Sequence, residues 1–296
     1  MHKLLFPSGS EAIHRLRVAI CSAMLCVPLL GWTATPPAKA AAPQRAVAGV
    51  PVLIYHEVVT DFRAEGETVI SLKNFTEQMQ LLADEGFVTV GIDELARYMK
   101  GEITLPAKAI VLTFEDGWKS VLNATPVLER LGFKASFWII TGNGIGGDYL
   151  GWSDIEKLAT DPRFEVYSHT VSHPWDERNN LVTWVQDKAN DRGRTDALAE
   201  LSDSKRVLEQ HLGRPVRYLA WPSGWFNDSL VTLAQEAGYS GLVTQESGLN
   251  RPGDDVLRIK RTFVDGACDM LTFRRTVTTG QYYVCQQRGG QRRSPG

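Results

Sequence analysis

The most informative stretch of the chain is Ala109-Ile110-Val111-Leu112-Thr113-Phe114-Glu115-Asp116-Gly117. It begins as a short apolar run with β-branched residues, which predicts a strand buried on both faces. The run ends in two adjacent carboxylates and a glycine. Because burying a charge without a partner costs several kcal/mol, we expect the acidic pair to have a structural or chemical role. It either caps the helix that comes next or serves a metal ion or a water molecule at the end of the strand.

Polar residues come directly after three other predicted strands. They are His56 after the run 50–55, His169 and His173 after the run 164–168, and the turn Pro222-Ser223-Gly224 after the run 216–221. Ligand sites in parallel sheets lie at the carboxyl ends of the strands. We therefore expect these residues to gather with Glu115 and Asp116 at one edge of a sheet.

Strands and helices alternate along the chain, which predicts an α/β fold with a mainly parallel sheet, open or closed into a barrel. A helix is expected from Gly117 to about Leu131, interrupted or kinked by Pro126. The last strand is expected at residues 256–259, with a final helix at 269–278. No internal repeat is visible.

The histidines are few, and their spacing is informative only in context. Two histidines four residues apart, such as His169 and His173, would reach one side of a helical turn and could bind one ion. That spacing is common by chance, and His56 alone is more simply read as a histidine satisfied by a neighbouring group. The position of all three after predicted strands favours a metal-dependent site. His211 resembles an ordinary surface residue at a helix end.

Composition sets broad limits on function. The chain has 296 residues, of which 43% are hydrophobic and 22% charged, with a formal net charge of −2. These values are typical of a globular protein with one large domain or two small ones. No long basic run is present, which argues against nucleic acid as a partner. The oligomeric state is left open.

The first forty residues have the pattern of a secretory signal peptide. Three basic residues precede an apolar run, residues 18–32, that is short for a membrane span, and Ala38-Lys39-Ala40 comes next as a cleavage signal. We expect cleavage after Ala40, no membrane span in the mature chain, and a periplasmic or extracellular location; the alternative is an uncleaved anchor. The predicted organisation is a signal peptide at 1–40, a linker at 41–49, one domain at 50–282 and a flexible basic tail at 283–296.

Export bears on the cysteines. The mature chain keeps only Cys268 and Cys285. In an oxidising compartment they could pair, but two free thiols are nearly as compatible with the sequence.

Three stretches in order resemble the motifs of the polysaccharide deacetylases, carbohydrate esterase family 4. They are Thr113-Phe114-Glu115-Asp116-Gly117, Ser168-His169-Thr170-Val171-Ser172-His173 and Leu219-Ala220-Trp221-Pro222-Ser223-Gly224. The lead-in 51–56 and Leu105-Pro106 are similar to one branch, which includes the poly-β-1,6-N-acetylglucosamine deacetylases. The resemblance covers roughly residues 50 to 280.

The resemblance implies a deformed (β/α) barrel in one domain, with a divalent metal, usually zinc, held by Asp116, His169 and His173. Such a metal acidifies a bound water and polarises the acetamide carbonyl. Glu115 matches the family's general base. The backbone N–H of Ser223 would help to stabilise the oxyanion, and Trp221, Pro222 and Ser223 would contribute to substrate binding.

Three departures from the family pattern affect the expected site. Glu115 replaces the usual aspartate, and a misplacement of roughly 1 Å can cost about a hundredfold in rate. Ser223 stands where an aromatic residue is usual. No Leu-x-His occurs near the C-terminus to supply a protonating histidine; Leu257-Arg258-Ile259 stands there instead, and Arg258 is assigned to substrate binding. His56 is therefore assigned the general-acid or oxyanion-stabilising role.

The implied function is an exported, metal-dependent hydrolase that removes N-acetyl groups from an N-acetylhexosamine polysaccharide resembling poly-N-acetylglucosamine. One alternative is a weakly active or inactive polysaccharide-binding module, with Glu115 marking the loss of activity. Another is a deacetylase of peptidoglycan or another acylated glycan. Five tryptophans either stack on sugar rings or pack structurally: Trp138, Trp152, Trp175, Trp221 and Trp225.

Overall fold

A computed structural model of the chain describes residues 48–61, 65–186 and 191–285. The predicted signal peptide, nearly all of the predicted linker and most of the predicted basic tail lie outside these residues. Within them, no helix is both long and apolar enough to cross a membrane.

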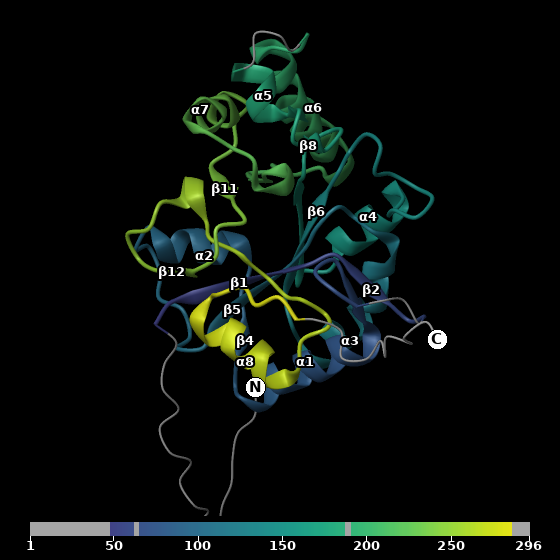
Figure 1. The fold of residues 1–296 in the computed structure, drawn as a ribbon, viewed down its shortest axis with the longest axis vertical. Helices are drawn as coiled ribbons and strands as arrows, with labels where there is room; N and C mark the ends of the chain where they lie inside the picture. The colour runs from purple at the N-terminus through teal and green to yellow at the C-terminus, as the bar shows by residue number, and fades with distance from the viewer. Residues whose placement is uncertain (1–47, 62–64, 187–190, 286–296) are drawn as a thin grey trace, which may run out of the picture. The chain divides into compact units, whose positions relative to one another are not determined.

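The predicted central strand is present as β5 (Ala109–Phe114), and all six of its residues are buried. It lies between β1 (Val50–Tyr55) and β6 (Ala135–Ile139) and runs parallel to both. The sheet continues through β7 (Phe164–Ser168) and β10 (Tyr218–Ala220) to β11 (Gly241–Val243), again in parallel. Together these strands form the curled half-barrel drawn in Figure 1. The expected α/β fold with a mainly parallel sheet is confirmed.

Shorter strands complete the sheet. β4 (Val88–Thr89) pairs with the start of β5. On the other side of β1, β12 (Leu249–Asn250) pairs in antiparallel fashion with its first residues, and β13 (Thr262–Phe263) pairs in parallel with Leu53 and Ile54. Two small ribbons lie outside the sheet: β2 (Glu57–Val59) with β3 (Val69–Ser71), and β8 (Trp175–Asp176) with β9 (Asn179–Asn180).

The segment 259–263 connects the two outer parallel strands of the half-barrel, β11 and β1. Ile259 pairs with Val243 of β11, and three residues later β13 pairs with β1. The expected strand at 256–259 is therefore wrong for most of its length, because Val256–Arg258 form a short 3-10 helix and only Ile259 joins the sheet. Arg261 therefore lies between β11 and β1 in this segment.

The helices result from their apolar faces and end signals. α1 (Leu72–Asp84) is capped by Ser71, whose side chain accepts a hydrogen bond from the backbone N–H of Asn74. The long α6 (Arg194–Leu212) ends at Gly213, which adopts the left-handed conformation that glycine allows. The expected helix from Gly117 to Leu131 is divided into a 3-10 helix, Lys119–Asn123, and α3 (Thr125–Leu131). Pro126 stands in the first turn of α3, where it is tolerated.

The remaining helices surround the sheet. They are α2 (Ile92–Met99), α4 (Trp152–Thr160), α5 (Leu181–Gln186), α7 (Asp228–Glu236) and α8 (Met270–Thr279). In Figure 1, α5, α6 and α7 lie together at the top of the view, where α6 contacts both of the others. The helix α8 packs on β1. A disulfide joins Cys268 and Cys285 on either side of α8, so the paired alternative is the one observed.

Candidate active site

The polar residues at the strand ends come together at the carboxyl edge of the sheet. Asp116 after β5 and His169 and His173 after β7 each offer one ligand atom, and these atoms all lie within 4.8 Å of one another. In the part of the chain that the structure describes, this is the one group of three histidine, cysteine or acidic side chains that could hold a metal ion. Two carboxyl-end loops thus build the cluster.

A sharp turn aims Asp116 into this cluster. Asp116 and Gly117 both adopt the left-handed conformation, with φ of 66° and 77°, which is costly for a residue other than glycine. One carboxylate oxygen of Asp116 lies 3.4 Å from Nε2 of His169 and 3.7 Å from Nε2 of His173. The other accepts a hydrogen bond of 3.0 Å from the indole of Trp118. The aspartate is therefore held at both oxygens.

The two histidines are brought together by a strained turn, and the expected helical turn is wrong. Thr170 and His173 have φ of 66° and 51°, and the Thr170 hydroxyl accepts a hydrogen bond from the backbone N–H of His173. Nδ1 of His169 lies 3.0 Å from the carbonyl oxygen of Ala220 in β10. A carbonyl at Nδ1 favours the tautomer that leaves Nε2 free as a ligand.

The charges in the cluster suit metal binding. Burial opposes ionisation of Asp116, but the hydrogen bond and charge of His169 outweigh it and lower the pKa of Asp116. Burial, and after it the charge of His169, lowers the pKa of His173 to about 4, so its ring is neutral near neutral pH. Two imidazole nitrogens and one carboxylate oxygen are a donor set that zinc accepts while keeping a coordination position open. These three residues fit the expected divalent metal.

Glu115 lies beside the cluster in a fully buried ion pair. Its side chain is 1% exposed, and its Oε1 lies 2.6 Å from Nη2 of Arg261, which is 0% exposed. Nε of Arg261 donates to the carbonyl of Thr244 at 2.8 Å. Burial by itself would raise the pKa of Glu115, but Arg261 first and His169 next outweigh it, so the pKa is lowered. Glu115 is therefore held as a carboxylate.

Comparison with known proteins agrees with this geometry. The family model described as polysaccharide deacetylase matches residues 102–242, which contain Glu115, the three potential ligands and the turn at Pro222. The chain carries a polysaccharide deacetylase domain. The Escherichia coli K12 poly-beta-1,6-N-acetyl-D-glucosamine N-deacetylase is 24% identical over 232 residues, or 68% of this chain and 34% of that protein. Bacillus subtilis YxkH, provisionally described as a polysaccharide deacetylase, is 26% identical over 203 residues, covering 68% of this chain and 66% of the relative.

Solved structures confirm the expected deacetylase fold. IcaB from Ammonifex degensii superposes with a TM-score of 0.68 at 26% identity, covering 78% of this chain and 97% of that one. BC0361, a polysaccharide deacetylase from Bacillus cereus, superposes with a TM-score of 0.63 at 26% identity, covering 77% of this chain and 69% of that one. The deformed (β/α) barrel is thus the architecture of this deacetylase domain. The chain spans only a third to two-thirds of the curated relatives named above.

His56 lies beside the carboxylate oxygen of Glu115 that does not face Arg261. Its Nε2 is 3.6 Å from Oε2 of Glu115. Its ring is buried and parallel to that of Phe263, with ring centroids 5.8 Å apart. The amide of Gln245 also approaches Oε2 of Glu115, at 3.5 Å. The structure therefore places both expected catalytic residues, Glu115 and His56, side by side.

The third motif forms a rim beside the candidate site. Trp221 and Pro222 are buried, and Trp221 stacks on Phe226. Ser223 is exposed, with a left-handed φ of 49°. A Cβ on the next residue, Gly224, would lie 3.0 Å from the side chain of Gln245. Because Gln245 in turn approaches Glu115, this turn adjoins the carboxylate of Glu115. Any contribution of Trp221 to substrate binding would come from supporting the turn.

Arg258 lies along the same rim. Its guanidinium pairs with Asp228 at 2.8 Å and lies over the ring of Phe226. Of the five tryptophans, Trp138 and Trp221 are packed in the core, Trp152 stacks on His211, and Trp175 and Trp225 are 65% and 43% exposed. Trp175 is the first residue of β8, two residues after His173, and Trp225 lies two residues after Ser223.

Sequence reasoning missed Arg261. The alternation of Ile259, Arg261 and Phe263 would have placed a single cation on the same face of a strand as two large apolar residues. That pattern is a signal for a buried, paired charge.

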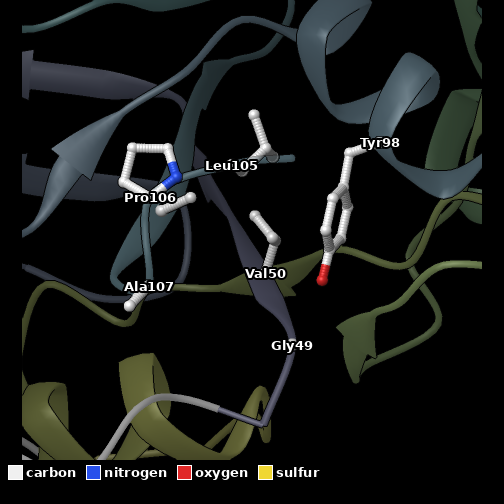
Figure 2. A pocket seen from close by; sticks show the side chains of 7 residues that line it. Gly49, Val50, Tyr98, Leu105, Pro106 and Ala107 are labelled. Carbon is white, nitrogen blue, oxygen red and sulfur yellow. The ribbon is translucent and has the colours of Figure 1, made fainter. Parts of the chain in front are cut away.

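A cavity lined mainly by apolar residues lies at the opposite edge of the sheet. Figure 2 shows it between Val50 at the start of β1, Tyr98 of α2 and Leu105 before β5. Its volume is about 140 Å³. Because it lies at the amino ends of the strands, it is separate from the candidate site at their carboxyl ends.

Proposed function

We propose that the chain is an exported, metal-dependent enzyme that removes N-acetyl groups from an N-acetylhexosamine polysaccharide of the poly-N-acetylglucosamine type. The observation that carries this proposal is the ionised Glu115 beside the cluster of Asp116, His169 and His173. A base next to a three-ligand site with room for water is the arrangement that metal-assisted hydrolysis requires.

Each residue has a role in this proposal. Asp116, His169 and His173 would hold the ion, which when bound supplies an acidified water and polarises the acetamide carbonyl. Glu115 takes a proton from the attacking water, and Arg261 keeps its carboxylate ionised and oriented. His56 gives a proton to the amine as the C–N bond breaks. The N–H of Ser223 stabilises the developing oxyanion.

The choice of a polysaccharide substrate rests on two supports. Several relatives are named as poly-beta-1,6-N-acetyl-D-glucosamine N-deacetylases. In addition, Trp175 and Trp225 expose indole rings two residues beyond His173 and Ser223. Exposed aromatic faces beside a catalytic site can pack on sugar rings.

Export is supported by the sequence and by one covalent bond. Residues 1–40 have the pattern of a signal peptide, and the Cys268–Cys285 disulfide is the kind of bond that persists outside the cytoplasm. We expect the mature protein to begin at or near Ala41, and N-terminal sequencing of the exported protein checks this.

The decisive experiment measures metal content and acetate release together. The mature protein, purified without chelator, is incubated with poly-N-acetylglucosamine, peptidoglycan and an O-acetylated glycan. We expect one divalent ion per chain, with zinc the metal expected, and acetate from poly-N-acetylglucosamine. A metal-loaded protein that releases no acetate from any of them would instead be a polysaccharide-binding module.

A further inference from the structure

The ring of His56 is oriented mainly by packing. Its Nε2 is 3.6 Å from Glu115, longer than an ordinary hydrogen bond. Its Nδ1 is buried, and the described residues offer it no hydrogen-bond partner. Catalytic histidines are commonly oriented through a group on the second nitrogen. Here another feature must hold the ring.

That feature is Phe263. The two rings are parallel within 5°, with centroids 5.8 Å apart. Phe263 ends β13 and pairs with Ile54 of β1, and His56 comes directly after β1. Backbone pairing between β13 and β1 therefore places the aromatic ring against the imidazole. Phe263 and Arg261 are two residues apart, so the same short segment supports both His56 and Glu115.

Tyr282 is a second aromatic neighbour of Phe263. Their ring centroids are 5.7 Å apart. Burial first, and then the carboxylates of Glu67 and Asp265, raise the pKa of Tyr282 to about 12. Tyr282 is thus a neutral ring that contacts Phe263 from the segment after α8.

The disulfide ties this segment to the loop after β13. Cys285 is bonded to Cys268, and its backbone N–H donates to Oδ2 of Asp265 at 2.9 Å. The other oxygen of Asp265 accepts from the N–H of Ala267 at 2.9 Å. The two ends of the 268–285 loop are therefore joined next to Phe263 and Tyr282.

We propose that Phe263 is a positioning residue for His56, and that the Cys268–Cys285 disulfide maintains it through Tyr282. This inference rests on the proposed role of His56 as proton donor. A proton donor acts only within a narrow range of distance and orientation, and a misplacement of roughly 1 Å can cost about a hundredfold in rate. Breaking the disulfide should therefore lower turnover while leaving the metal ligands untouched.

The test compares four variants of the mature protein. Phe263→Leu keeps apolar volume but removes the flat ring, and Phe263→Tyr restores it. The double variant Cys268→Ser/Cys285→Ser removes the disulfide without a reductant that could disturb the metal. Phe273→Leu is the matched control, because Phe273 is a buried residue of α8 inside the same disulfide loop.

We expect Phe263→Leu to lose about 10- to 100-fold in kcat, with KM and metal content unchanged. Phe263→Tyr should recover most of the turnover. The cysteine double variant should lose turnover in the same direction, and Phe273→Leu should keep it. Wild-type kcat in Phe263→Leu, or an equal loss in Phe273→Leu, would overturn the positioning role; wild-type kcat in the cysteine variant would overturn the part assigned to the disulfide.

A second readout separates this inference from the proposed function. The ring-proton chemical shifts of His56 report the neighbouring aromatic ring whether or not the protein turns over substrate. They should move in Phe263→Leu and in the cysteine variant and stay in Phe273→Leu. If the wild type releases no acetate from any glycan, the proposed function is wrong. The contact between Phe263 and His56 is overturned by a different result, namely unchanged His56 chemical shifts in Phe263→Leu.

Discussion

The carboxylate of Glu115 has a different partner at each oxygen: Oε1 faces Arg261 and Oε2 faces His56. Glu115→Gln should lose about 100- to 10,000-fold in kcat, the usual contribution of general acid–base catalysis, and should keep the metal. Glu115→Asp should also be slower, because the shorter side chain draws back from Arg261 and from the reacting water. Deacetylation rates at measured metal occupancy check both.

The matched control is Glu129→Gln on the exposed face of α3, which should behave as wild type. Equal rates for wild type and Glu115→Gln at full occupancy would remove Glu115 from the mechanism. A higher rate in Glu115→Asp would mean that the longer glutamate is poorly accommodated, and that the chain is a weakened enzyme.

The metal ligands give a second prediction at the same scale. Replacing Asp116, His169 or His173 by alanine removes one of three donors from a cluster whose ligand atoms lie within 4.8 Å of one another. Each variant should lose tight binding of the divalent ion and all hydrolysis. Competition with a chelator measures the affinity. His211→Ala, at the stack with Trp152, is the control and should bind the ion normally.

At the scale of elements, the turn after β7 depends on α6. One carboxylate oxygen of Glu200 accepts hydrogen bonds from both the backbone N–H and the hydroxyl of Ser172, the residue before His173. Supporting groups of this kind contribute roughly 10- to 100-fold to metal affinity. We expect Glu200→Ala to weaken metal binding by about that factor.

Glu200→Gln should lose less, because its amide oxygen can still accept a hydrogen bond. Zinc dissociation constants for the two variants, measured at equal folded fraction, make the comparison. Identical zinc affinities in wild type and Glu200→Ala would show that the turn at His173 keeps its conformation without the hydrogen bonds to α6.

At the scale of the whole molecule, Glu165 links stability to pH far from the site. It lies at the amino end of β7 and accepts hydrogen bonds from Ser136 and from the N–H of Ile92. A Cβ on Gly91 would lie 2.3 Å from its carboxylate, so a larger residue at position 91 would displace the Glu165 side chain. Burial is the first cause that raises the pKa of Glu165.

A raised pKa means that the folded state holds this proton more tightly than the unfolded chain. The stabilisation is fully present below the unfolded pKa and is lost as the pH rises through the folded value. The free energy of unfolding of the wild type should therefore fall, relative to that of Glu165→Gln, as the pH rises above about 4, the ordinary pKa of a glutamate. Urea midpoints at several pH values test this, and parallel profiles would contradict it.

Local sequence was sufficient to predict the central strands and the polar residues at their carboxyl ends. The apolar runs at β1, β5 and β7 are local signals, and parallel strands present their carboxyl ends at one edge. That was enough to bring His56, Glu115, Asp116, His169 and His173 together at one edge of a mainly parallel sheet; the deformed barrel was implied by the resemblance to the polysaccharide deacetylases. The proposed ligand set of Asp116, His169 and His173 was implied by the resemblance to the polysaccharide deacetylases.

How these side chains are held depends on tertiary structure. The Arg261–Glu115 pair joins residues 146 positions apart, through a segment that crosses between the two edges of the sheet. The contact of Phe263 with His56 and the pairing of Cys268 with Cys285 likewise depend on where that segment lies. Local periodicity identifies a buried face but not the partner packed against it. Partner choice is set by sheet closure, and closure is a property of the whole chain.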